Sequence, residues 1–233
     1  YTVSESYLGE ALSGGLREKF ILATKSMSRG YADMARDIGI SLSNLRTDYI
    51  DLYQLHNIKS DADFELAFSA EGAVAAIQDA IRAGKVGHLG ATAHSVDSFE
   101  RLLSYPEIET IMFPYNIVES QGEALMERAA AQNVGVIAMK PLAGGNITDG
   151  TLAMRYILQN KTCTLAIPGM ATLEEIEQNT AAAEQDGPAA LDLLDRLLHS
   201  LTVPWDLSAS PLYRHLATKE AAGEAQSVLL EPL

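Results

Sequence analysis

Six short apolar runs, separated by segments of helical pattern, are the feature that most restricts the fold of this sequence. Each run has no more than eight residues and is apolar nearly throughout, which is typical of strands buried on both faces of a parallel sheet. The runs are residues 20–25, 51–56, 86–93, 110–116, 134–140 and 162–169. A chain with this pattern is expected to alternate strands and helices.

The segments between the runs repeat apolar residues at helical spacing. The pattern holds for Tyr31, Met34, Ile38 and Leu42, for Val74, Ile77 and Ile81, and for residues 120–132 and 172–184. A βα repeat of about 25 to 30 residues predicts an α/β fold of the (β/α)8 TIM-barrel class. A Rossmann sheet is the alternative fold, but no GxGxxG motif follows any of the runs.

The two ends of the chain carry further predictions. Residues 2–15 predict a helix that Ser4 caps and Gly14 ends, with one apolar face formed by Tyr7, Leu8, Ala11 and Leu12. Only six of a barrel's eight strand–helix units are visible and the chain begins at Tyr1 without Met, so we expect the first strands to be absent from the sequence given. We expect a barrel over residues 1–186, and a C-terminal helix (188–203) with an irregular tail over residues 187–233.

Composition narrows the partners and the compartment. The 233 residues are 47% hydrophobic, enough for a sizeable core, and the formal net charge of −14 disfavours nucleic acid and anionic membranes as partners. No apolar run reaches the roughly 18 residues of a membrane span, and no basic, apolar leader is visible. The single Cys163 excludes an internal disulfide and fits a reducing compartment. We therefore expect a cytoplasmic protein.

Titratable side chains close several of the predicted strands. In a barrel, the carboxyl ends of the strands face the active site, and those positions here are Lys25, His56, His94, Asn116, Lys140 and Gly169. Taken alone, Lys25 fits a surface lysine and His56 a core histidine, but their places on successive units favour a catalytic rim. Asp48 and Asp51 lie at the start of a strand, so we expect a structural role for them at the barrel floor.

Five motifs resemble the aldo-keto reductase family in order and spacing over residues 1–184. They are FILATKSMSRG, SLSNLRTDYIDLYQLH, GKVGHLG, GVIAMKPLAGG and IPGMATLEEIEQN. The last two resemble a bacterial branch whose late strands run into MKPLAGG and IPGM. The resemblance implies NAD(P)H-dependent reduction of an aldehyde or ketone to an alcohol, with a tyrosine as general acid beside a lysine, a histidine and an aspartate.

The resemblance places these roles on Tyr1, Lys25 and His56, because YTVSE matches the segment that carries the family's tyrosine. The family's aspartate lies upstream of Tyr1 and is outside this sequence. The chemistry is reasonable, since a free tyrosine has a pKa near 10 and a neighbouring ammonium would lower it. An imidazole can orient and polarise the carbonyl. We expect His94 and Asn116, at neighbouring strand ends, to contact the substrate.

The cofactor site that the resemblance implies departs from the family pattern. Thr92 keeps a hydroxyl while Ala93 loses an amide, Met112 replaces a glutamine, and Met139 replaces an aromatic that stacks on the nicotinamide. Glu175 replaces an arginine that binds the 2′-phosphate. The full set expected to bind NADP or NAD is Thr92, Met112, Met139, Lys140, Pro141, Leu142, Gly144, Gly169, Met170, Thr172, Glu175 and Asn179.

These departures predict that NADH is accepted, because Glu175 would repel a 2′-phosphate and could instead accept a hydrogen bond from a ribose hydroxyl. A solvated helix residue is the other interpretation of Glu175. No metal is expected, and Cys163 alone cannot supply an iron–sulfur centre. Two functional alternatives stay open: a non-catalytic protein that binds a dinucleotide or a partner, and a barrel enzyme that forms a Schiff base on Lys25 or Lys140.

Overall fold

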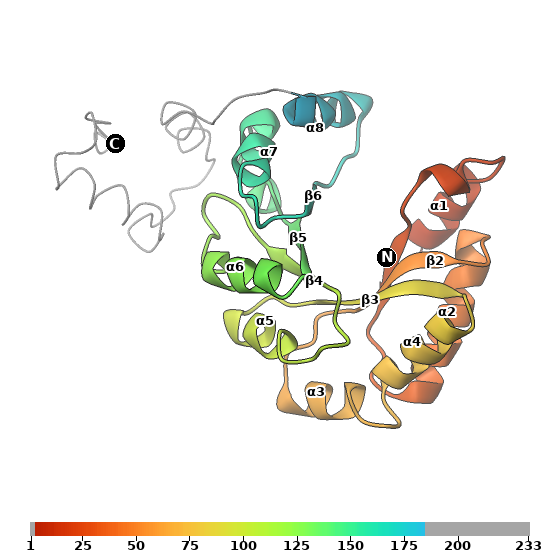
Figure 1. The fold of residues 1–233 in the computed structure, drawn as a ribbon. Coiled ribbons are helices and arrows are strands. Elements are labelled where there is room, and N and C mark those ends of the chain that lie inside the picture. Colours follow the sequence, from red (N-terminus) through yellow and green to blue (C-terminus); the bar gives the residue numbers. More distant parts are fainter. Residues whose placement is uncertain (1–2, 185–233) are drawn as a thin grey trace. The chain divides into compact units, whose positions relative to one another are not determined.

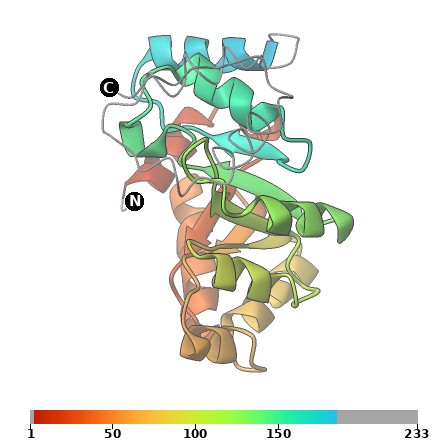
Figure 2. The same ribbon diagram turned by 90° about the vertical axis from the view of Figure 1, so that its left-hand side faces the viewer.

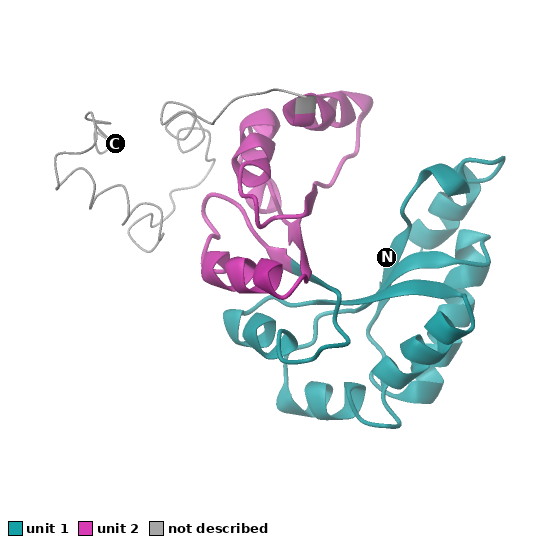
Figure 3. Ribbon diagram, viewed as in Figure 1, with its two compact units in different colours: residues 1–112 teal, residues 113–233 magenta. Residues whose placement is uncertain are grey.

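The structure of the protein, a computed structural model, describes residues 3–184. Tyr1, the predicted helix 188–203 and the tail therefore lie outside the described residues. The chain divides into two compact units at Met112 and Phe113 (Figure 3), and each is described by itself below. The predicted boundary at residue 186 falls outside the described part and stays a prediction.

Six parallel strands follow one another in chain order (Figure 1). They are β1 (Ala23–Ser26), β2 (Ile50–Leu55), β3 (Val86–Thr92), β4 (Thr110–Pro114), β5 (Gly135–Met139) and β6 (Leu165–Ile167). Each apolar run of the sequence overlaps one of them, and a helix follows each strand along the chain. The predicted βα alternation is confirmed.

Helices α2 (Tyr31–Leu45) and α4 (Ala73–Arg82) lie side by side against the strands of unit 1 (Figure 1). Two residues of each sequence pattern are buried, namely Met34 and Ile38 of α2 and Val74 and Ile77 of α4, whereas Tyr31 is 38% exposed. The same unit contains α1 (Ser4–Ala11), the 3-10 helix η1 (Arg17–Lys19), α3 (Asp61–Ala67) and α5 (Val96–Leu102). The apolar helical spacing thus located the faces of α2 and α4.

The first helix differs from its prediction in both cap and face. Val3, rather than Ser4, is the N-cap, while Tyr7 and Leu8 are 68% and 44% exposed. The helix packs on α2 through Gly9 instead, where a Cβ would lie only 2.3 Å from the carbonyl oxygen of Asn44. Close backbone approach, which the apolar pattern does not record, decides how α1 packs.

Unit 2 contains α6 (Glu123–Ala131), the 3-10 helix η2 (Ala143–Gly145), α7 (Gly150–Leu158) and α8 (Leu173–Glu184). Figure 2 shows α7 and α8, in teal and blue, side by side. Part of the core of this unit is a cluster of buried apolar residues, namely Ile117, Ala143, Ile147, Leu152 and Ala153. The cluster connects the segment after β4, the loop after β5 and helix α7.

Strands β1 and β6 each begin three residues after the start of their apolar runs. Phe20 and Ile21, expected in the first strand, precede β1 and are 53% and 85% exposed. The run 162–169 begins with a turn, because the side-chain oxygen of Asn160 accepts hydrogen bonds from the backbone and hydroxyl of Thr162. The strand therefore starts only at Leu165.

Asp51 has the structural role expected of it. Its Oδ2 accepts hydrogen bonds from Nη2 of Arg17, at 2.7 Å, and from the backbone N–H of Leu22, at 2.9 Å. Partial burial acts to raise the pKa of Asp51, but these hydrogen bonds hold it below its usual value. Among the described helices, none combines the length and the apolar character needed to cross a membrane.

Candidate active site

Lys25 and His56 lie at the carboxyl-terminal edge of neighbouring strands in unit 1. Lys25 is the third residue of β1, in register with Gln54 of β2, and His56 directly follows the last residue of β2. The backbone N–H of His56 donates to the carbonyl of Ser26 at 2.8 Å, which extends the pairing of the two strands by one residue. The structure therefore brings together two of the residues that the sequence singled out.

The environment of these two side chains favours an uncharged imidazole. Burial lowers the pKa of His56 below 6.5, and the nearby positive charges of Lys25, His94 and Arg29 act in the same direction. Burial also lowers the pKa of Lys25. At neutral pH the ring of His56 is consequently neutral, so one ring nitrogen can donate a hydrogen bond and the other can accept one.

A pocket of about 390 Å³ lies beside Lys25, lined mainly by residues of α1, β1 and α2. Two carboxylates in its wall are already hydrogen-bonded. Glu5 accepts from the hydroxyl of Thr24 at 2.7 Å, and Asp37 accepts from the hydroxyls of Ser26 and Ser28 at 2.6 Å each. The wall next to Lys25 is therefore polar and acidic.

Thr92, expected to contact the cofactor, supports the loop after β2. It is 1% exposed, its Oγ1 accepts from the backbone N–H of Asn57 at 2.6 Å, and its carbonyl accepts from Ile58 at 3.2 Å. Met112, in register with Thr92 on β4, is also buried. His94 is exposed in the loop after β3 and is close enough to His56 to lower its pKa.

Asn116, expected to contact substrate, is fully buried in unit 2 and has four hydrogen bonds. Its Nδ2 donates to Glu119 and to the carbonyl of Lys140, and its Oδ1 accepts from the backbone of Val118 and Glu119. These bonds use the whole capacity of a side-chain amide, so they favour a loop-organising role. Direct contact of Asn116 with a substrate stays a prediction.

The loop after β5 contains a run of left-handed backbone. Lys140, Ala143, Gly144 and Gly145 have φ values of 54°, 48°, 69° and 94°. A Cβ built at either glycine would meet no atom within 4 Å, so this backbone is open to a ligand. Met139 is half-buried at the end of β5, Pro141 is buried, and Leu142 packs against the apolar cluster of unit 2. Met139, Pro141 and Leu142, which are expected to bind the cofactor, therefore lie in or next to one accessible loop.

The backbone N–H groups at the start of α8 are bound by the carboxylate of Glu175, a residue of the same helix. Oε2 of Glu175 accepts from the backbone N–H groups of Ala171, at 2.5 Å, and Thr172, at 3.2 Å. The N–H of Glu175 donates in return to Oγ1 of Thr172 at 3.2 Å. This reciprocal arrangement is a capping box, and the spacing T-x-x-E is its sequence signature. That signal was present in the sequence and would have identified the role of Glu175.

The other residues expected near the cofactor flank this helix start. Gly169 and Met170 are exposed. Asn179 is 8% exposed, and its Oδ1 would lie 3.4 Å from a Cβ at Gly150, so it packs between α8 and α7. Within residues 3–184, His, Cys, Asp and Glu side chains form no group of three or more that could hold a metal ion.

Parallel βα units with titratable groups at the strand ends are typical of barrel enzymes. The family model of the aldo/keto reductase family matches residues 1–151. The protein therefore belongs to the aldo/keto reductase family. The sequence-based assignment to this family and to its α/β barrel fold class is confirmed.

Three similar proteins illustrate this relationship. Methylglyoxal reductase YeaE of Escherichia coli is 27% identical over 220 residues, which cover 83% of this chain and 74% of that protein. The holo form of an aldo-keto reductase from Bacillus halodurans has a TM-score of 0.71 at 21% identity, covering 87% of this chain and 80% of that chain. An aldo/keto reductase from Klebsiella pneumoniae, in complex with NADP and acetate, has a TM-score of 0.67 at 24% identity, covering 86% and 76%.

The two structural similarities show the fold alone. The matched region covers about half the length of several curated relatives, 52% of one and 49% of two others.

Proposed function

We propose that the protein reduces an aldehyde or ketone to an alcohol with a reduced nicotinamide dinucleotide as hydride donor. The observation that carries this proposal is the pair Lys25 and His56, an ammonium and a neutral imidazole at adjacent strand ends. Membership of the family supports it. Small aldehydes such as methylglyoxal are the proposed substrates, in line with the name of the Escherichia coli relative.

The protein's own residues supply the proton chemistry. Addition of a hydride to a carbonyl carbon leaves an alkoxide, which must receive a proton. Tyr1 is proposed as the acid, and the Lys25 ammonium would lower the pKa of its phenol by favouring the phenolate. His56 would donate a ring N–H to the carbonyl oxygen, a role that suits a neutral imidazole.

The open loop after β5 fits a dinucleotide, since its glycine backbone leaves room for a ligand. When bound, the reduced cofactor supplies the hydride to the carbonyl carbon. The start of α8 fits a 2′-phosphate poorly, because the Glu175 carboxylate already occupies two of its N–H groups. Met139, Gly144 and the neighbouring loop residues are therefore proposed to hold the dinucleotide.

Steady-state kinetics with methylglyoxal and either reduced cofactor tests the proposal. We expect Tyr1→Phe, Lys25→Met and His56→Gln each to lower kcat by about 10²- to 10⁴-fold, the usual range for acid–base assistance, while cofactor binding measured by fluorescence persists. His88→Gln is the matched control, because His88 lies on the amino-terminal half of β3 and its exposed ring pairs with Glu109. Full turnover by both Lys25→Met and His56→Gln would refute the assignment.

The lowered pKa of Lys25 also suits a lysine that forms an imine with a carbonyl substrate. Borohydride treatment in the presence of substrate separates this second candidate from the first. A reduced adduct on Lys25, found by peptide mass spectrometry, would favour Schiff-base chemistry. An unmodified Lys25 together with cofactor-dependent turnover would exclude it.

A further inference from the structure

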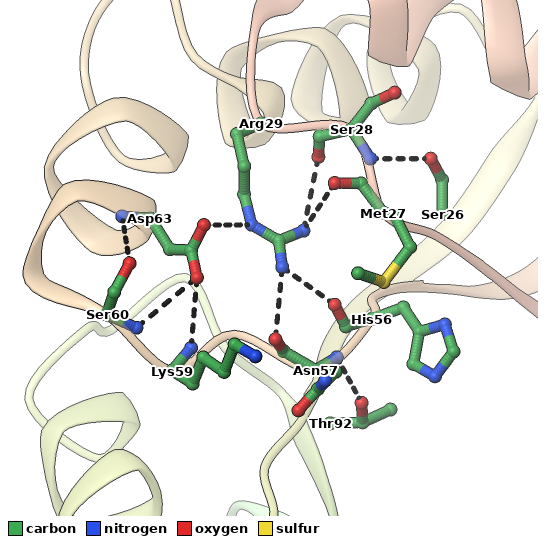
Figure 4. Close-up of polar contacts among 10 residues, drawn as sticks. All are labelled: Ser26, Met27, Ser28, Arg29, His56, Asn57, Lys59, Ser60, Asp63 and Thr92. Atoms are coloured by element: carbon green, nitrogen blue, oxygen red, sulfur yellow. Dashed lines mark hydrogen bonds and ion pairs between the residues drawn. The ribbon is translucent and has the colours of Figure 1, made fainter.

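The guanidinium of Arg29 joins three segments beside His56 (Figure 4). Arg29 belongs to the loop between β1 and α2, and its side chain is only 9% exposed. Nη2 donates to the carbonyls of His56, at 2.7 Å, and Asn57, at 3.2 Å. Nη1 donates to the carbonyls of Met27, at 3.0 Å, and Ser28, at 3.4 Å.

One carboxylate accompanies these four carbonyls. Oδ1 of Asp63, in the first turn of α3, lies 3.4 Å from Nε of Arg29, so this contact is an ion pair rather than a well-formed hydrogen bond. Asp63 is itself held by the capping box that it forms with Ser60. Burying a guanidinium destabilises a protein unless its N–H groups find hydrogen-bond acceptors. Here main-chain carbonyl oxygens of two loops are most of those acceptors.

The hydrogen bonds from Arg29 add to others that hold the main chain on both sides of His56. Its N–H donates to Ser26 of β1 and its carbonyl accepts from Arg29. The next residue, Asn57, has a left-handed φ of 51° and donates to Thr92 of β3. The loop is thus held from β1, from β3 and from the guanidinium. The backbone dihedral angles of His56 limit the rotamers that its ring can adopt.

We propose that Arg29 is a positioning residue that fixes the backbone of His56 and so presents its imidazole to the carbonyl substrate. This inference rests on the proposed function of His56. Arg29 acts on His56 through the main-chain carbonyls that it binds. Its planar guanidinium has several N–H donors, so it can bind carbonyls of two loops at once. A lysine at this position would retain the positive charge but would lack the fork.

Arg29 has a second effect on His56, through its charge. Within residues 3–184, the charged and titratable groups that act on the ring are Lys25 from β1, His94 from the loop after β3, and Arg29 itself, whose charge Asp63 partly offsets. The three basic groups lower the pKa of His56 in addition to burial. Removing the guanidinium is therefore expected to raise that pKa, whereas Arg29→Lys should leave it nearly unchanged.

The test uses the full chain and the variants Arg29→Met and Arg29→Lys. Arg101→Met is the matched control, because the Arg101 guanidinium pairs with Asp61 and lies 4.2 Å from the centre of the Phe64 ring, both on α3. Long-range ¹H–¹⁵N spectra give the pKa and tautomer of His56, whose signal among the five histidines is assigned by its loss in His56→Gln. Kinetics with NADH and methylglyoxal give kcat and KM.

We expect Arg29→Met to raise the pKa of His56 and to lower kcat about tenfold or more, with a smaller change in KM. Arg29→Lys should keep the pKa and still lower kcat, while Arg101→Met should alter neither the titration nor kcat. Wild-type kcat and wild-type titration in a folded Arg29→Met protein would overturn the proposal. If that variant does not fold, wild-type kcat in Arg29→Lys would overturn it equally.

If the proposed function is wrong, the same experiments give results that differ from those expected if Arg29 has no effect on His56. Full turnover by His56→Gln would remove the catalytic role of His56, but in the Arg29 variants the tautomer of His56 would still report whether the guanidinium fixes the ring, and its titration would report the effect of the charge.

Discussion

At the scale of single residues, burial shapes both groups of the candidate site. Lys25 and His56 each have a pKa below the ordinary value, chiefly because the folded chain removes water from them. Their positions at strand ends followed from the apolar runs, but their charge states did not, since desolvation depends on the loops and helices that pack around them.

The lowered pKa of His56 predicts how stability depends on pH. The unfolded chain takes up a proton near pH 6.5, whereas the folded chain does so only at lower pH. His56 therefore makes the protein less stable as the pH falls from about 6.5 toward the folded pKa, and its contribution is complete above that window. We expect His56→Gln to flatten the dependence of the free energy of unfolding on pH below about 6.5, as measured by urea unfolding. An unchanged slope would contradict this account.

The position of Glu175 leads to a prediction of cofactor preference. Because Glu175 belongs to a capping box, two substitutions can separate its charge from its hydrogen bonds. Glu175→Gln keeps an acceptor for the N–H groups of the helix start and removes the charge, whereas Glu175→Arg loses both. We expect wild-type protein to bind NADH at least as tightly as NADPH. We also expect Glu175→Gln to strengthen NADPH binding about fivefold with little change for NADH, from about 1 kcal/mol of charge interaction at a helix terminus.

Fluorescence titration of both reduced cofactors decides this point. Thermal unfolding provides the control: the melting temperature should fall less in Glu175→Gln than in Glu175→Arg. NADPH binding about a hundredfold tighter than NADH in the wild-type protein would mean that a basic group elsewhere in the chain holds the 2′-phosphate.

At the scale of elements, the packing of α1 depends on a single glycine. A Cβ at Gly9 would overlap the backbone of Asn44 and Leu45, whereas one at Gly39, also within a helix, would meet nothing within 4 Å. Gly9→Ala should therefore destabilise the protein by about 1–3 kcal/mol, as overpacking does. Gly39→Ala should stabilise it by about 0.5–1 kcal/mol through helix propensity. Urea unfolding of both variants measures the difference, and equal effects would show that α1 does not pack through Gly9.

Element ends were less predictable than element types. The apolar runs located all six strands, because burial on both faces of a parallel sheet requires continuous apolar sequence. They overestimated β1 and β6, where apolar residues are exposed or belong to a turn. Capping by Val3 and the short approach at Gly9 depend on neighbouring backbone, so the apolar pattern of α1 could not reveal them.

At the scale of the whole molecule, the order of the strands and the family could both be predicted from the sequence, since motif order and βα alternation are linear properties. Two elements of the candidate site, Lys25 and His56, followed from the rule that strand ends face the site. The hydrogen bonds of Asn116 and Thr92 did not, because they join segments far apart in the chain. Arg29 was missed for the same reason: its partners lie 27 and 28 residues away.

The single guanidinium that joins the loops after β1 and β2 has an evolutionary consequence. Loops at the strand ends of a barrel normally diverge independently, which is how one scaffold acquires many specificities. Here an insertion or deletion in either loop would withdraw carbonyls from a buried cation, so changes in one loop are tolerated only with matching changes in the other. New specificities in this lineage should therefore arise first in loops that Arg29 does not hold.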